Sequence, residues 1–157
     1  MTAEQIRSLL LDSSLRLLAS PTPAEPGAIA SLVRDAPMEL PDDYLHLLAV
    51  ADGVQGDLGM APGWVMLWPA AAVTAGNRSC DVLRRHPGFL AVGTSGGFGF
   101  GPGDGDVVFA FRIEEGSGSA VYGIPGECVD ASEIRTLVDN FGAFVRAIGR
   151  LCPGDAA

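Results

Sequence analysis

Apolar residues along this chain follow two different periods, and each period predicts its own kind of element. Nearly every position from Tyr44 to Ala51 is apolar; Pro41 suits a first helical turn, and Gly53 can end a helix in the left-handed conformation. These features predict a helix from Pro41 to Asp52. His46 is the only polar residue in its interior, so its side chain should be buried on most sides.

Four further helices are predicted, at residues 2–19, 28–34, 70–76 and 130–151. The first begins with Thr2 and Gln5, and the last with Asp130 and Glu133, both spaced as a capping box. The last helix is the best marked, because apolar residues repeat at helical spacing from Ile134 to Leu151. Its inner face should place Phe141 and Phe144 in the core. Residues 77–86 read as a polar surface segment.

Four strands are predicted where apolar or alternating residues are bounded by turn residues, at 64–68, 89–92, 106–113 and 120–124. The turn at 114–118 should join the last two as an antiparallel hairpin. Residues 128–129 could add a short edge strand, and glycine-rich loops are expected at 54–63 and 93–105. This order predicts an α+β fold, with a mainly antiparallel sheet of four to six strands flanked by helices. One domain should cover residues 1–157.

Composition narrows the classes of function. The chain has 157 residues, ten Arg, no Lys and a net charge of −9, which disfavours a nucleic-acid partner. It contains no run of eighteen apolar residues and no basic region before its first apolar run. We therefore expect no membrane span, no secretory signal and a cytoplasmic location. Three scattered cysteines without a CxxC pair indicate reduced thiols rather than disulfides or a zinc site.

The motifs for chemistry are weak. Residues 93–97 match G-x-S-x-G, but no helix can follow Ser95 and both histidines lie upstream, so a flexible loop is favoured over a nucleophile. No phosphate-binding glycine pattern is complete. Asp104 and Asp106 lack the further carboxylates of a calcium loop. We therefore expect no catalytic residue, no cofactor and no metal.

The most suggestive feature is a run of six carboxylates that no Arg interrupts: Asp35, Glu39, Asp42, Asp43, Asp52 and Asp57. The run is either a solvated face or a docking surface for a basic partner. A helix start explains Asp42 without a partner, so Asp52 and Asp57 are the stronger docking candidates. Trp64 and Trp68 lie on the same face of their strand. This face either packs in the core or is exposed, in which case Trp64 could anchor a partner.

Five pieces of the sequence together resemble the SUKH superfamily of Smi/Knr-like domains. They are Leu40-Pro41-Asp42-Asp43-Tyr44 with Asp52-Gly53, Leu67-Trp68-Pro69 leading to Asn77, Pro87 to Gly93, the hairpin to Val121-Tyr122, and Phe141 to Val145. They occur in the family's order and cover about residues 40–151. The resemblance implies a non-enzymatic α+β domain that binds other proteins.

The resemblance also implies two roles. Bacterial members are similar to immunity proteins that block a toxin, and fungal members resemble scaffolds of cell-wall signalling. We expect the first role: occlusion of a basic toxin by a face carrying Asp42, Asp43, Asp52 and Asp57, with Trp64 as an anchor. The alternative is a regulatory scaffold with an endogenous partner. The sequence leaves the partner's identity and the oligomeric state open.

Overall fold

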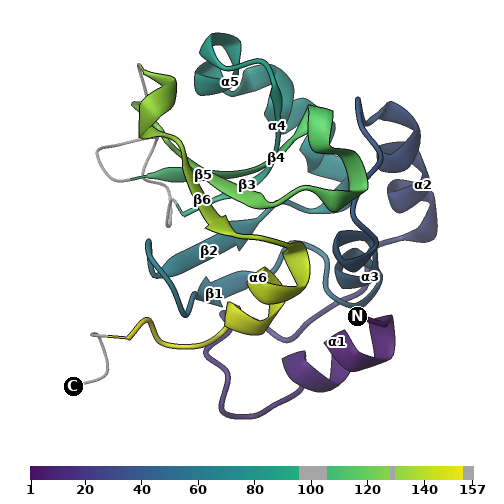
Figure 1. The fold of residues 1–157 in the computed structure, drawn as a ribbon. Coiled ribbons are helices and arrows are strands. Elements are labelled where there is room, and N and C mark those ends of the chain that lie inside the picture. The colour runs from purple at the N-terminus through teal and green to yellow at the C-terminus, as the bar shows by residue number, and fades with distance from the viewer. Residues whose placement is uncertain (96–105, 128–129, 154–157) are drawn as a thin grey trace.

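In the described part of the chain, six strands form one antiparallel sheet, and each strand pairs with the next along the chain (Figure 1). The computed structural model describes residues 1–95, 106–127 and 130–153. The strands are β1 (Gln55–Asp57), β2 (Trp64–Leu67), β3 (Phe89–Thr94), β4 (Val107–Arg112), β5 (Val121–Pro125) and β6 (Arg135–Val138). The predicted α+β class, with an antiparallel sheet of four to six strands, is therefore confirmed. The finer assignment to a SUKH fold stays a prediction.

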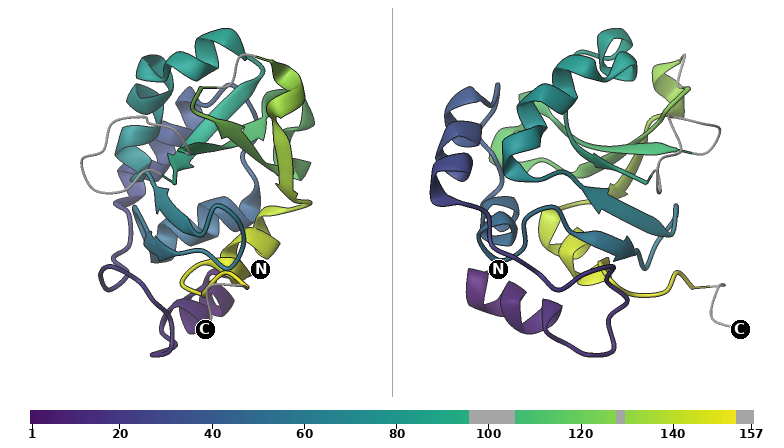
Figure 2. Two further views of the ribbon diagram at one scale, coloured as in Figure 1. Left: turned by 90° about the vertical axis from the view of Figure 1, so that its left-hand side faces the viewer. Right: turned by 180° about the vertical axis from the view of Figure 1, so that it is seen from behind.

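The helices pack around this sheet. They are α1 (Ala3–Leu10), α2 (Pro26–Asp35), α3 (Asp42–Val50), α4 (Val73–Ser79), α5 (Asp81–Arg85) and α6 (Phe141–Ala147). Short 3₁₀ turns are η1 (Ala70–Ala72), η2 (Ile113–Gly118) and η3 (Ala131–Glu133). Three views place α5 at one end of the molecule and α1 at the other (Figures 1 and 2).

Alternation along the strands divides the apolar residues between the two faces of the sheet. Phe109 and Phe111 of β4 point to the main core, which also contains buried residues of α1, α3 and α6. Val108 and Ala110 point to the opposite face, where Val82 and Leu83 of α5 cover them. The sheet is thus buried on both faces over its central strands.

An aromatic cluster fills the centre of the main core. The rings of Tyr44 and Phe111 meet edge to face at 5.4 Å, and those of Tyr44 and Phe141 at 5.3 Å. Phe144 meets Phe109 edge to face at 5.2 Å. Phe141 and Phe144 are both buried, as the sequence predicts. The cluster joins α3 and α6 to the sheet.

The outer edge of β1 is covered by the chain that follows α1. Leu17 pairs with Gly56 in an antiparallel bridge, and the Leu18 and Asp57 amides donate to the carbonyl oxygens of Gln55 and Arg16. Gly56 permits this approach, because a Cβ there would lie 3.1 Å from the Leu17 Cα. The sequence predicted a helix through residue 19, but α1 ends at Leu10, and residues 16–18 lie along the edge of the sheet instead.

The predicted helix 130–151 is wrong in its first half. Asp130 and Glu133 do form a capping box, but it caps only the turn η3, and residues 135–138 form β6. Thr136 and Val138 are β-branched and suit a strand. The side chain of Asn140 then caps α6, accepting from the Ala143 amide at 2.9 Å. Gly149, with φ of 80°, follows where the helix has ended.

Smaller differences concern the ends of elements. The helix predicted at Pro41–Asp52 runs from Asp42 to Val50, and Gly53 adopts the expected left-handed φ of 70°. The polar segment 77–86 is mostly helical, as the end of α4 and all of α5. Strand β1 lies inside a predicted loop. The predicted turn 114–118 consists of 3₁₀ turns broken at Gly116, and it joins β4 and β5 as the predicted antiparallel hairpin. Residues 96–105 and 128–129 lie outside the described part of the chain.

Candidate functional site

Asp42 and Asp43 begin α3, where carboxylates favour the positive end of the helix. Asp42 is exposed, and its carboxylate has no ion pair or hydrogen bond among the described residues. Asp43 is 24% exposed and pairs with the amino group of Met1 at 2.8 Å. Its other oxygen faces the start of α6, since a Cβ on Gly142 would lie 2.8 Å from Oδ2.

These two carboxylates border a cavity of about 230 Å³, called the acidic cavity below. It is lined by Pro41, Asp42, Asp43, Ser117, Gly118, Ser119, Asn140 and Phe141. The starts of α3 and α6 meet here beside the end of η2. The backbone N–H groups of a first helical turn lack partners within the helix, and carboxylates are favourable beside them. The cavity could take a positively charged side chain.

The other two acidic candidates have structural partners. Asp52 follows α3 and accepts a hydrogen bond from the Ala70 amide at 2.7 Å, at the start of η1. Asp57 ends β1, is 27% exposed, and lies 3.8 Å from the guanidinium Nε of Arg16. The structure therefore brings Asp42 and Asp43 together but separates both from Asp52 and Asp57. The sequence favoured Asp52 and Asp57 as docking residues, whereas the geometry favours Asp42 and Asp43.

The two tryptophans do not form a common exposed face. Trp64 is half-buried at the start of β2. Trp68 lies beyond the end of that strand, and its ring packs against α4, where a Cβ on Gly76 would approach it to 2.7 Å. Trp68 therefore serves packing. The anchoring role of Trp64 stays a prediction.

Sequence reasoning missed a larger groove, called the α2–α5 groove below. Its volume is about 450 Å³, and its walls come from the end of α2, from α4 and α5, and from the start of β3. The apolar side chains in it include Leu32, Leu83, Phe89, Leu90 and Ile113. The lining residues extend from Leu32 to Ile113 in the sequence, so no local pattern could have revealed the groove.

A second hollow of about 350 Å³ adjoins the groove and shares Pro87, Phe89 and Ile113 with it. Arg112 borders this hollow, with its guanidinium 5.4 Å from the ring centre of Phe89 and 4.7 Å from that of Tyr122. Such stacking holds a cation against aromatic rings. The two hollows therefore lie side by side, on either side of the residues that they share.

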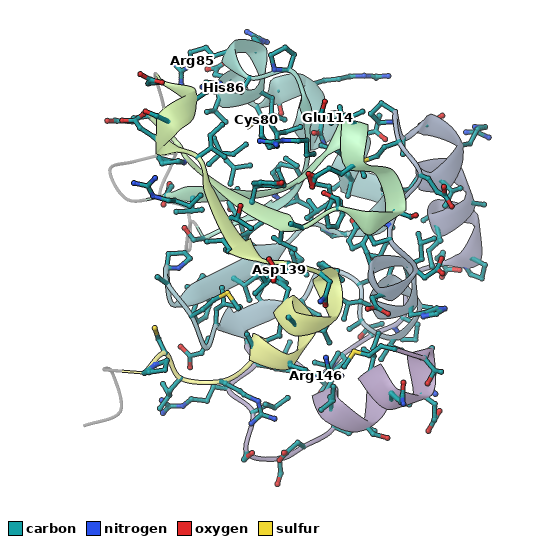
Figure 3. The ribbon with its side chains drawn as sticks, viewed as in Figure 1. Cys80, Arg85, His86, Glu114, Asp139 and Arg146 are labelled. Atoms are coloured by element: carbon teal, nitrogen blue, oxygen red, sulfur yellow. The ribbon has the colours of Figure 1, made fainter. Side chains whose placement is uncertain are left out.

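The residues with possible chemistry lie apart. His46 is half-buried and donates from Nδ1 to the Met1 carbonyl oxygen at 2.7 Å. Ser95 Oγ accepts from the Val107 amide at 2.8 Å, which ties β3 to β4. Cys80 and His86 flank α5, far from Arg146 on α6 (Figure 3). Within the described ranges, no group of His, Cys, Asp and Glu is placed to hold a metal ion.

Burial raises the pKa of two tyrosine hydroxyls. Burial raises the pKa of Tyr44 far above its usual range, and the negative charge of Asp52 raises it further. The Tyr44 hydroxyl has no hydrogen-bond partner in the part of the chain described. Burial also raises the pKa of Tyr122, whose hydroxyl donates to Glu115 at 2.8 Å. Both hydroxyls should stay protonated at neutral pH.

No family model matches the chain, and no curated protein matches it. Among the helices described, none has both the length and the apolar character needed to cross a lipid bilayer.

Proposed function

We propose that this chain is a non-enzymatic protein-binding domain that neutralises a basic partner, as an immunity protein does with its toxin. The observation that carries the proposal is the acidic cavity, where the unpaired, exposed Asp42 lies beside Asp43. A Lys or Arg side chain of the partner would enter the cavity and pair with Asp42. The net charge of −9 would attract a basic partner over long range.

The contacts of the four carboxylates support unequal roles in the proposed docking. Asp42 is available without cost to the fold, whereas Asp52 and Asp57 are already engaged by Ala70 and Arg16. We therefore assign Asp42 the main docking role and Asp43 a supporting one. Asp52 and Asp57 contribute mainly to the overall negative field. The resemblance to the SUKH superfamily supports the same class of function.

The test begins with the genes next to this one, since immunity genes are expected beside their toxins. Each neighbouring product is expressed alone and together with this chain. Rescue of growth, together with a purified complex whose association slows as salt is added, is expected. No rescue by any neighbour, combined with stable binding to a constitutive host protein, would favour the scaffold alternative and refute the proposal.

A variant pair then locates the interface. Asp42→Asn should slow association several-fold, while Glu25→Gln, which removes one charge from an exposed residue at the start of α2, should change it little. Both variants should unfold at the same denaturant concentration as the wild type. Equal effects of the two substitutions on association would reject a specific role for the acidic cavity.

A further inference from the structure

The α2–α5 groove has the size and lining of a binding site. Its volume of about 450 Å³ lies within the range of about 300–1,000 Å³ that ligand sites occupy. Leu83, Leu90 and Ile113 supply apolar surface, and Asn77 and Thr74 supply polar groups. Nothing in the proposed function uses this groove, because the acidic cavity is built from different residues.

Charge distinguishes the groove from the rest of the molecule. The groove and its adjoining hollow are lined by three of the chain's ten Arg residues but by only two of its 19 Asp and Glu residues. The three are Arg78, Arg84 and Arg112, and the two acids are Asp35 and Glu114. A chain of net charge −9 thus presents an apolar depression with a positively charged border.

Two of these arginines have acidic partners among the described residues. Arg84 lies 3.2 Å from Asp81, and Arg112 lies 4.0 Å from Glu114 while stacking on two rings. The acid Asp35 is itself paired with Arg34 at 3.3 Å. Arg78 is exposed on α4 and has no ion pair or hydrogen bond among the residues that the structure describes. Its guanidinium is free to pair with a carboxylate of an occupant.

We propose that the α2–α5 groove binds a segment of a partner protein that inserts an apolar side chain beside an Asp or Glu. The apolar side chain fills the groove between Leu83 and Ile113, and the carboxylate pairs with Arg78. A second side chain of the segment occupies the adjoining hollow beside Gly88. This goes beyond the proposed function, because the occupant's charge is opposite to that of a basic toxin.

The shape and charge of the site favour this occupant over two others. The depression extends through two adjoining hollows that share Phe89 and Ile113, which suits successive side chains of one segment better than one small molecule. A second copy of the chain is disfavoured, since two molecules of charge −9 repel each other at long range.

Two variants with matched controls test the site. Gly88 has open space around its Cβ position, so Gly88→Trp can fill the adjoining hollow without disturbing the fold. Gly27 has equally open space and lines none of the cavities described here, so Gly27→Trp is its control. Arg78→Gln removes the free cation. Its control, Arg7→Gln, removes a cation that pairs with Glu4 on α1, at the far end of the molecule.

The probe is a display library of short random peptides selected on the immobilised full chain. Enriched peptides are synthesised with a fluorescent label, and their binding is measured by anisotropy. We expect them to combine an apolar residue with Asp or Glu, to bind Gly88→Trp and Arg78→Gln about tenfold more weakly, and to bind both controls as they bind the wild type. Added salt should weaken binding to the wild type more than to Arg78→Gln.

Several results would overturn the proposal. If no enriched peptide binds Gly88→Trp more weakly than Gly27→Trp, the groove is not a peptide-binding site. Enriched peptides without carboxylates would remove the role of Arg78. A wild-type dimer that Gly88→Trp dissociates would assign the groove to a second copy. Saturable, Arg78-dependent binding of dodecanoate with an affinity above that of the peptides would assign it to a small amphiphile.

Discussion

Asn77 offers the sharpest test of how the sheet is held together. Its side-chain NH₂ group donates to the Ala91 and Val73 carbonyl oxygens, and its side-chain oxygen accepts from the Ala91 amide, each at 2.8 Å. The pairing of β3 with β4 shifts register between Ala91 and Gly93, and β2 pairs with β3 only at Gly93 and Thr94. Asn77 therefore takes the place of a strand neighbour for Ala91.

The size of the effect follows from the groups that lose a partner. Asn77→Ala leaves the amide and the carbonyl of Ala91, a fully buried residue, without their partner. Each such group costs about 1–3 kcal/mol. Asn77 itself is half-buried and borders the α2–α5 groove, so water can enter and reduce the loss. We expect the free energy of unfolding to fall by about 2–4 kcal/mol.

Urea titration followed by circular dichroism measures this loss, and an unchanged slope shows that the fold is kept. Asn77→Asp should be nearly as damaging, because a carboxylate can accept from the Ala91 amide but cannot donate to its carbonyl. Ser79→Ala is the control, since that hydroxyl bonds only carbonyls of its own helix. Ordinary surface substitutions change the free energy of unfolding by less than about 0.5 kcal/mol. A loss that small for Asn77→Ala would refute the role of Asn77 as a partner for Ala91.

Three further predictions concern the core. Phe144→Ala should lower the free energy of unfolding by about 3–5 kcal/mol in the same titration, because the ring is buried between Phe109 and Phe141; a loss near 1 kcal/mol would contradict its placement. Gly93→Ala should strongly destabilise or prevent folding, because its Cβ would lie 2.8 Å from the Leu67 Cα and closer still to the Met66 carbonyl oxygen; unchanged thermal unfolding would argue against the pairing of β2 with β3. Tyr44→Phe should keep or slightly raise stability at neutral pH, since it removes a hydroxyl without a described partner. Burial raises the pKa of Tyr44 in the folded state, so the wild type should lose stability as the pH rises above about 10 and the variant should lose less. Parallel pH dependence of the two proteins would contradict this assignment.

Local patterns predicted much of the fold. The run 107–112 is rich in β-branched and aromatic residues, which favours the strand that is observed. The observed ends of α3 lie within two residues of the predicted ones. The error at residues 134–138 has a physical cause. The helical spacing of apolar residues is satisfied by Ile134, Leu137 and Val138. The segment forms a strand because it pairs with β5, and Asn140 caps the helix that begins after it.

The candidate site was less predictable, because sequence spacing does not reveal tertiary partners. Asp57 seemed unpaired in a run without Arg, yet Arg16 reaches it from a segment 41 residues earlier. Asp52 seemed free beside a glycine-rich loop, yet it caps the turn at Ala70. Asp42 was discounted because a helix start explains it, and the structure leaves it the most available of the four carboxylates.

The strip of chain at Arg16–Leu18 has a consequence for solubility. Because it occupies the outer hydrogen-bonding edge of β1, that edge is not offered to other molecules. Removing residues 1–20 would do more than delete a helix: it would expose unpaired backbone groups of β1 beside the apolar surface that Ile6 and Leu10 now cover. A shortened chain should therefore associate edge to edge, and its sedimentation should depend on concentration. The amino-terminal segment therefore protects the edge of β1 from association with other chains.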